Sequence, residues 1–144
     1  MTVRSREGDL QRRSFDISAM TFGGAPVPFG ARVGQLFASS GIPGTDPHTG
    51  VMPDNDAQQV ENLFANIKRG VEASGGSVAQ ILKCTFHVRD EDVRKHINLH
   101  WEAMFPDPAN RPARHTLRLQ SYPREYAVMA EFLAVVPSGE TGKD

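Results

Sequence analysis

Residues 58–89, QQVENLFANIKRGVEASGGSVAQILKCTFHVR, change from one hydrophobic period to another and thereby decide the fold. In the first part, apolar residues recur three or four positions apart, which predicts a helix with one apolar face. That face consists of Val60, Leu63, Phe64, Ile67 and Val71. We expect the other side of the helix to be largely solvated, with Gln58, Gln59, Glu61, Lys68 and Arg69.

From residue 81 to residue 89 the apolar positions alternate, which predicts a strand with one buried face. The buried set is Leu82, Cys84, Phe86 and Val88. The opposite set is Lys83, Thr85, His87 and Arg89. A helix followed at once by such a strand indicates that helices pack on a sheet.

The limits of the helices follow from residues that begin or end them. Asp54 or Asp56 can accept the free amides of the first turn, and Gly75–Gly76 ends the helix after about Ser74. A second helix is predicted over 90–105, ended by Pro106. Its apolar stripe consists of Val93, Ile97, Trp101, Met104 and Phe105.

Four further strands are predicted, at residues 15–22, 32–40, 115–120 and 126–136. The first 14 residues and the tail from 138 to 144 are polar, so we expect an ordered core over about 15–137. Two loops rich in turn residues, at 23–30 and 41–50, interrupt the chain. Prolines at positions 26 and 28 exclude a central strand from the first of these loops.

The last strand is apolar on both faces. Two helices can cover about one face of a sheet, so a chain of 144 residues cannot easily bury the other. We therefore expect another subunit to cover the second face.

Composition limits the partners of the chain. Sixteen Lys and Arg residues against 17 Asp and Glu leave a net charge of −1, which makes nucleic acid an unfavoured partner. A single cysteine excludes an internal disulfide and fits a reducing compartment. There is no signal sequence and no apolar run near the roughly 18 residues of a membrane span, so we expect one soluble, cytoplasmic domain over 1–144.

One charge, Glu131, interrupts the apolar last strand. Burial of an unpaired carboxylate is costly, so this residue must reach water or find a cation. It is either a strand residue that points to solvent or a carboxylate that holds a catalytic water.

The segment RPARHTLR at 111–118 brings Arg111, Arg114 and Arg118 to one junction between a loop and a strand. Arg114 follows Pro112, which stiffens the chain there, and a guanidinium can bind a carboxylate through two hydrogen bonds. Because surface arginines are common, this pattern alone is compatible with either a solvated cation or an anion site.

Other candidate sites are weaker. His96 and His100 are four residues apart on a helix, but no third metal ligand has a telling spacing, so we expect solvated histidines and no metal. Cys84 alternates with apolar residues, which favours a core residue over a nucleophile. The stretch GGAPVPFG lacks the lysine of a phosphate-binding loop.

Several segments, in their order and spacing, resemble the RidA/YjgF family, whose members are also called endoribonuclease L-PSP-like. They are SSGIPGTDPHTG (39–50), the helix at 58–77, ILKCTFHVRD (81–90), NLHWEAMFP (98–106), RPAR (111–114) and YPREYAVMAEFLAVV (122–136). The resemblance covers roughly residues 24–136. Its most specific parts are the Pro-Ala-Arg element and the terminal strand with its glutamate.

The resemblance implies a chorismate-mutase-like α+β fold, with a mixed sheet of about six strands and two helices on one face. It also implies a homotrimer with clefts between subunits, and cofactor-free hydrolysis of enamines and imines to a 2-keto acid and ammonia. Arg114 then corresponds to the residue that binds the substrate carboxylate, and Glu131 to the one that positions water. Asn98, Ser40 and Gly41 correspond to further residues of the cleft.

Two positions depart from the deaminating members that the chain resembles. Val27 replaces a tyrosine, and Thr116 replaces a cysteine two residues after the arginine; both belong to the wall that faces the substrate. These departures favour a second possibility, a non-catalytic or regulatory trimer that binds small carboxylates, whereas Arg114 and Glu131 favour the hydrolase. A ribonuclease, known in some members, is disfavoured by the net charge and by the lack of interleaved aromatic and basic residues.

Overall fold

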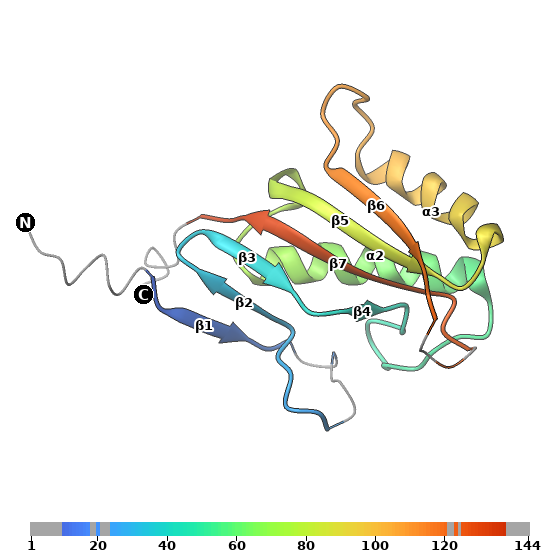
Figure 1. Cartoon of the computed structure of the whole chain (residues 1–144), viewed down its shortest axis with the longest axis horizontal. Coiled ribbons are helices and arrows are strands. Elements are labelled where there is room, and N and C mark those ends of the chain that lie inside the picture. Colours follow the sequence, from blue (N-terminus) through green and yellow to red (C-terminus); the bar gives the residue numbers. More distant parts are fainter. Residues whose placement is uncertain (1–9, 18–19, 21–23, 121–122, 124, 138–144) are drawn as a thin grey trace, which may run out of the picture.

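Two helices cover one face of a mixed β-sheet in the computed structural model of the protein, which describes residues 10–17, 20, 24–120, 123 and 125–137 (Figure 1). The strands are β1 (Arg12–Phe15), β2 (Gly30–Val33), β3 (Leu36–Ser39), β4 (Ile42–Pro43), β5 (Ile81–Val88), β6 (Ala113–Arg118) and β7 (Val128–Val135). The helices are α2 (Asp56–Ala73), the short 3₁₀ helix η1 (Val78–Gln80) and α3 (Glu91–Met104). This is the predicted combination of two long helices and one sheet.

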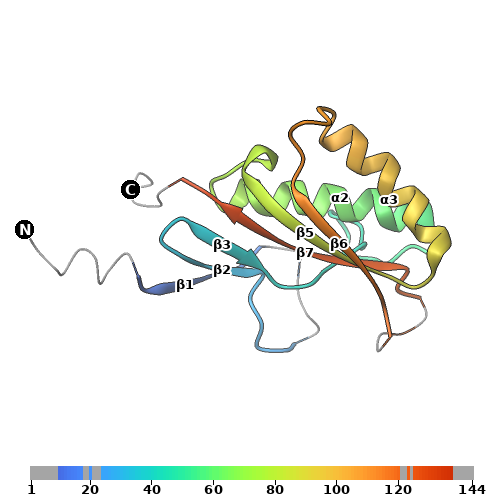
Figure 2. The ribbon, with the colours of Figure 1, turned by 45° about the horizontal axis from the view of Figure 1, so that its top comes forward.

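The sheet has the order β1-β2-β3-β7-β5-β6, and β4 pairs with β7 beside β3. Only the β5–β6 pair is parallel among these described pairs, because α3 connects the two strands as a crossover helix. The last strand, β7, lies between β3 and β5, and β6 is an edge strand. Figure 2 shows both helices on one side of the sheet, so no described helix covers its other face, which we call the open face.

Both helices begin and end close to their predicted limits. The side chain of Asn55, rather than Asp54 or Asp56, accepts the Gln58 amide at the start of α2, and Gly75 follows its end with φ +99°. Asp90 caps α3 through the amide of Asp92. An asparagine at the N-cap accepts this hydrogen bond as well as an aspartate does, which is why the sequence did not distinguish the three residues.

The core lies between the helices and the sheet. The predicted apolar face of α2 is buried, as are Val93, Ile97 and Trp101 of α3. They pack on the alternate residues of β5 and β7 that face the helices, and Phe29 and Phe37 extend this core under β2 and β3. The chain therefore forms a continuous core on one side of its sheet.

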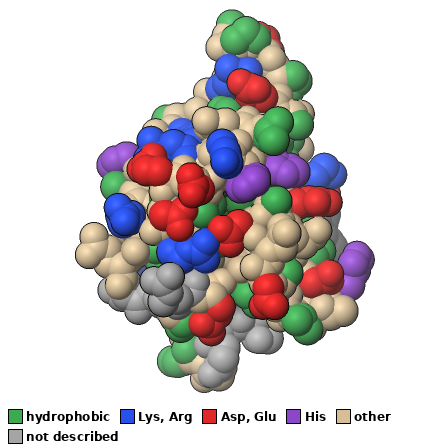
Figure 3. All heavy atoms as spheres, turned by 90° about the vertical axis from the view of Figure 1, so that its right-hand side faces the viewer, with side chains coloured by type: hydrophobic (Ala, Val, Ile, Leu, Met, Phe, Trp, Pro, Cys, Tyr) green, Lys and Arg blue, Asp and Glu red, His purple; other side chains and the backbone are tan. Residues whose placement is uncertain are grey.

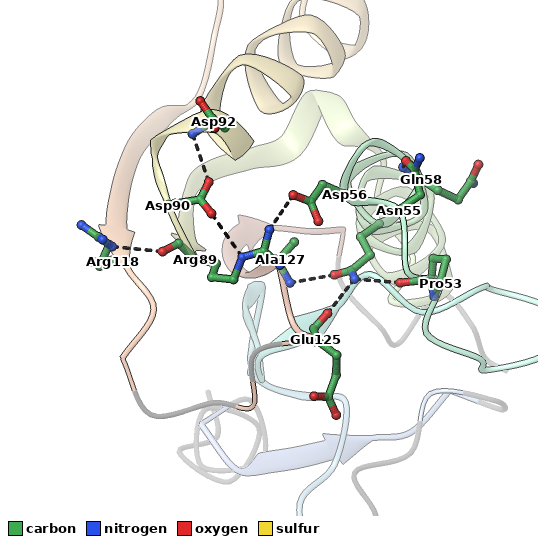
Figure 4. Close-up of polar contacts among 11 residues, drawn as sticks. Pro53, Asn55, Asp56, Gln58, Arg89, Asp90, Asp92, Arg118, Glu125 and Ala127 are labelled. Atoms are coloured by element: carbon green, nitrogen blue, oxygen red, sulfur yellow. Dashed lines mark hydrogen bonds and ion pairs between the residues drawn. The ribbon is translucent and has the colours of Figure 1, made fainter.

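Gln59 was predicted to lie on the solvated side of α2, and this prediction is wrong, because the residue is 1% exposed. Its side chain donates to the carbonyls of Pro53 and Glu125 and accepts from the Ala127 amide, and Figure 4 labels these three partners. Next to it, Arg89 bridges Asp56 of α2 and Asp90, the cap of α3. These contacts hold the start of β7 to both helices, and a helical period alone cannot reveal them.

Two strand predictions differ from the structure. The strand expected at 32–40 is a hairpin of β2 and β3, because Gly34 has φ +59° and turns the chain. Leu82 was expected in the core but is 58% exposed, and Ile81 is buried instead, because the β5–β7 register shifts between Ile81 and Lys83.

The N-terminal strand also differs from its prediction. Instead of 15–22, β1 spans 12–15 and pairs with β2, so polar residues expected to be loose form an edge strand. The rest of the predicted strand falls mainly on residues outside the described part, and so do the predicted loose ends at 1–9 and 138–144.

The open face of the sheet carries several exposed apolar side chains. Leu36 and Val135 are paired across β3 and β7 and are 53% and 47% exposed, and Leu133 is 38% exposed. Leu82 and Leu117 are exposed as well. On the face of β7 that points away from the helices, Leu133 and Val135 are exposed whereas Met129 is buried, and cover by a second subunit stays a prediction.

Candidate functional site

Arg114 lies on the helix side of the edge strand β6, directly beside Cys84 of β5. Its guanidinium carbon is 5.2 Å from the centre of the Trp101 ring and 5.6 Å from that of Phe86. The Nε atom donates to the Thr116 hydroxyl at 3.2 Å. Burial lowers the pKa of Arg114 from its ordinary value, and the charge of Arg94 lowers it further.

This guanidinium lacks an anionic partner within the described part of the chain. The other two arginines of the RPARHTLR segment bind backbone carbonyls: Arg111 donates to Phe105 and Arg118 donates to Arg89. Arg114 forms no ion pair with a described carboxylate, and its terminal nitrogens donate to no described acceptor. A half-buried cation held by two aromatic rings and left without a counter-charge is suited to bind an anion.

Glu131 lies on the open face of the sheet, beside Thr85 of β5. Its side chain is 52% exposed, so the strand carries this carboxylate without burying it. Nε2 of His87 is 3.6 Å from the nearer carboxylate oxygen.

Sequence reasoning missed His87 as a site residue. The alternation of β5 correctly predicted that His87 and Thr85 share the polar face. It could not show that β7, far away in sequence, would place Glu131 opposite Thr85.

Ser40 and Gly41 lie where the chain passes from β3 to β4, next to Glu131 along β7. Ser40 donates from its hydroxyl to the Pro28 carbonyl at 2.8 Å and from its amide to the Phe29 carbonyl at 2.7 Å. It thereby holds the loop that carries Val27, which is 44% exposed. A side chain at position 41 would come within 3.0 Å of the Met129 methyl group, so a glycine suits this close approach.

The predicted site residues therefore form two groups. Arg114 and Thr116 face the helices, and Asn98 is an exposed residue of α3, one helical turn before Trp101. The other group is Glu131 with Ser40, Gly41 and Val27, around β7 and the segments next to it. Because Arg114 pairs with Cys84 and Glu131 with Thr85, the two side chains point to opposite faces of the sheet. One chain does not bring them together.

The weaker candidates occupy structural positions. Burial raises the pKa of the Cys84 thiol to about 12, so it stays protonated at neutral pH and packs in the core as expected. His100 stacks on the Phe64 ring with a centroid distance of 5.6 Å, so it is less solvated than predicted. Among the described residues, no three His, Cys, Asp or Glu side chains are arranged to hold a metal.

A groove of about 730 Å³ lies beside the N-terminal end of β6, lined by residues of η1, the end of α3 and the loop before β6. Arg111, Leu82 and Val135 contribute to it, whereas Arg114 and Glu131 do not. The groove reaches the exposed apolar residues of the open face. It is therefore continuous with the exposed apolar surface around Leu82 and Val135.

The charged surface is mixed in sign at one end of the molecule. Figure 3 shows acidic, basic and histidine side chains intermixed on this side, with no extended basic patch. This agrees with the near-zero net charge. None of the helices in the described part of the chain has the length and apolar character required to cross a membrane.

Comparison with known proteins adds independent evidence. Residues 25–136 match the family model described as Endoribonuclease L-PSP. The 2-iminobutanoate/2-iminopropanoate deaminase of Escherichia coli K12 is 32% identical over 111 residues, which are 76% of this chain and 87% of that protein. A RutC family protein of Aquifex aeolicus is 31% identical over 116 residues, covering 77% of this chain and 93% of the relative.

Solved structures show the same fold. The crystal structure of the E. coli YjgF gene product matches with a TM-score of 0.75 and 27% identity, over 85% of this chain and 98% of that one. A putative translation initiation inhibitor from Vibrio vulnificus matches with a TM-score of 0.76 and 27% identity, over the same shares of the two chains. The expected chorismate-mutase-like fold of the RidA/YjgF proteins is confirmed.

Proposed function

The chain belongs to the endoribonuclease L-PSP family, and on this premise we propose that it hydrolyses a reactive imine or enamine of a small carboxylic acid to the 2-keto acid and ammonia. The relatives named 2-iminobutanoate/2-iminopropanoate deaminase support this reaction class. The observation that carries the proposal is the half-buried Arg114, held between two rings with no described counter-charge.

The opposite orientations of Arg114 and Glu131 support a site made from two copies of the chain. In a homotrimer with clefts between subunits, Arg114 at the β6 edge of one copy meets Glu131 on the open face of the next. The exposed apolar side chains of that face provide the contact surface between copies. The trimer thus covers the open face and also completes the site.

Each residue then has a physical role. Arg114 binds the substrate carboxylate through two parallel hydrogen bonds, which fixes the C=N carbon next to a water held by Glu131 of the neighbouring copy. Glu131 accepts a proton as the water oxygen attacks this carbon. The resulting carbinolamine breaks its C–N bond, the nitrogen takes up a proton, and ammonia leaves the 2-keto acid. No cofactor enters this sequence of steps.

A second candidate function is non-catalytic binding of small carboxylates by the same trimer. Two observations favour it: the Thr116 hydroxyl is already bonded to Arg114, and Val27 supplies no hydroxyl or ring at the position of the deaminases' tyrosine. In this case Arg114 would bind the ligand, and Glu131 would not promote hydrolysis.

Both candidates can be tested with imino acids generated in situ. An amino-acid oxidase supplies 2-imino acids, semicarbazide traps what remains, and the loss of trapped product reports hydrolysis. We expect the wild type to accelerate hydrolysis and the Arg114→Ala variant to abolish the acceleration. No difference between these two proteins, across small and bulky side chains, would overturn the hydrolase.

A matched control and a binding measurement complete the design. Arg118→Ala removes the same charge from the same face of β6, but among the described residues its side chain bonds to a backbone carbonyl alone, so we expect hydrolysis to persist. The melting temperature with pyruvate reports binding separately. If pyruvate raises it in an Arg114-dependent way while no imine is consumed, the second candidate is correct.

A further inference from the structure

Arg94, on the first turn of α3, is a second cation whose charge acts on Arg114, and sequence reasoning did not single it out. Arg94, Asn98 and Trp101 are spaced four and three residues apart, so they share one face of the helix. Trp101 contacts the Arg114 guanidinium, so this helix face borders the anion-binding position.

The direction of the chain brings the two arginines toward each other. As a crossover between parallel strands, α3 runs opposite to β6, as Figure 1 shows. Moving along β6 from Arg114 therefore leads back toward the start of α3. The bond from Arg114 Nε to Thr116 turns the guanidinium in that direction.

Arg94 is also short of partners. Its Nε atom is buried and has no hydrogen-bond partner among the described residues, and a terminal nitrogen reaches Glu91 only at 3.5 Å. The Glu91 side chain is 72% exposed, so this pair is weak. The charge of Arg94 acts on Arg114, since it contributes to the lowered pKa of the latter. Two neighbouring guanidiniums without a shared carboxylate favour a ligand with two negative charges.

We propose that the site selects 2-imino acids that carry a second carboxylate, such as those derived from aspartate and glutamate, with Arg114 binding the first carboxylate and Arg94 the second. This rests on the proposed function and names its substrate class. The reaction is unchanged: water adds to the C=N carbon and ammonia leaves. Arg94 acts only on affinity and specificity.

Calorimetry with 2-keto acids, which the enzyme does not hydrolyse, measures binding affinity at the site without depending on catalysis. Oxaloacetate and 2-oxoglutarate carry two carboxylates, whereas pyruvate and 2-oxobutanoate carry one. We expect wild type to bind the dicarboxylates about tenfold or more tightly, the gain from one charge-assisted contact. Arg94→Gln removes that preference and leaves pyruvate affinity within about twofold. Arg94→Lys, which keeps the charge but loses the planar fork, retains part of it.

Lys95→Gln is the matched control, because it removes the same charge from the adjacent, exposed residue of α3. We expect this variant to keep the preference. Equal weakening of both ligand classes by Arg94→Gln, or an equal loss in Lys95→Gln, would show a general effect of charge and overturn the assignment. Arg114→Ala should abolish binding of both classes. If it does not, the proposed carboxylate site fails, whatever the effect of Arg94.

Discussion

Arg114 and Glu131 lie on either side of one strand, β5, and point to opposite faces of the sheet. Arg114 is paired with Cys84, which faces the helices, and Glu131 with the next residue, Thr85, which faces away. Two side chains fixed in this way cannot hold one small substrate together unless a second copy of the chain supplies one of them. The predictions below test this relationship and the framework that supports it.

Replacement of Gln59 should destabilise the fold although the residue is polar and lies on a helix. Gln59→Ala leaves the Ala127 amide and the Pro53 and Glu125 carbonyls without their partner. Unsatisfied buried groups of this kind cost about 1–3 kcal/mol in the free energy of unfolding. Urea denaturation measures the loss, and Glu61→Ala, at an exposed position of the same helix, should change stability by less than about 0.5 kcal/mol.

Gly70→Ala should also lower stability, although alanine is normally favoured within a helix by about 1 kcal/mol. A Cβ at position 70 would collide with the Phe29 ring, which packs directly on α2. Thermal unfolding should show a lower melting temperature for this variant. Gly70→Ala should lower stability by less when it is introduced into the Phe29→Leu variant than when it is introduced into wild type. An equal loss in both backgrounds would mean that the contact with Phe29 is not the cause.

Cys84 should make stability depend on pH in the alkaline range. Burial raises its folded pKa from 9.0 to about 12, so above pH 9 the unfolded chain releases a proton that the folded chain retains. The contribution of the Cys84 thiol to the free energy of unfolding is fully present below pH 9. It is lost as the pH rises toward 12, by up to about 1.4 kcal/mol per pH unit. Urea denaturation between pH 8 and 10 should therefore show a steeper fall for wild type than for Cys84→Ala. Parallel curves would contradict the buried thiol.

The sequence predicted the two long helices, the strands β5, β6 and β7, and the apolar faces between them, because these elements have regular periods. It did not predict the hairpin at Gly34, the shift that exposes Leu82, or the buried Gln59. The shift that exposes Leu82 and the burial of Gln59 depend on β7 and the loop before it, far away in the sequence, whereas the hairpin depends on the backbone conformation of Gly34. Local periods contain no information about such partners.

The residues of the candidate site were predictable from the sequence, but their arrangement in space was not. The residues themselves pointed to Glu131 and Arg114, and resemblance to a family gave these two their roles and added Ser40, Gly41, Asn98, Thr116 and Val27; all these roles remain proposals. The strand register then divided these residues between the two faces. His87 and Arg94 were not singled out, since the first depends on the pairing of β5 with β7 and the second on the packing of α3 against β6.

Oligomeric state provides a simple check of the open face. Exposed Leu36, Leu133 and Val135 should be covered in a trimer, so sedimentation at micromolar concentration should give a species three times the 15.8 kDa chain mass. Leu133→Lys should weaken the assembly, because a charge would be buried between copies. Leu99→Lys is the control at an exposed position of α3. A monomeric wild type would contradict the shared site.

Subunit complementation tests the central claim most directly. Arg114→Ala and Glu131→Gln chains, each inactive alone, are co-expressed with different tags, and the mixed assemblies are isolated and assayed for imine hydrolysis. If each site combines Arg114 of one copy with Glu131 of the next, a mixed trimer of either composition has one intact site out of three, and activity returns to about a third of wild type. Mixed assemblies that stay as inactive as the separate variants would show that both residues must belong to the same chain, and would contradict the account.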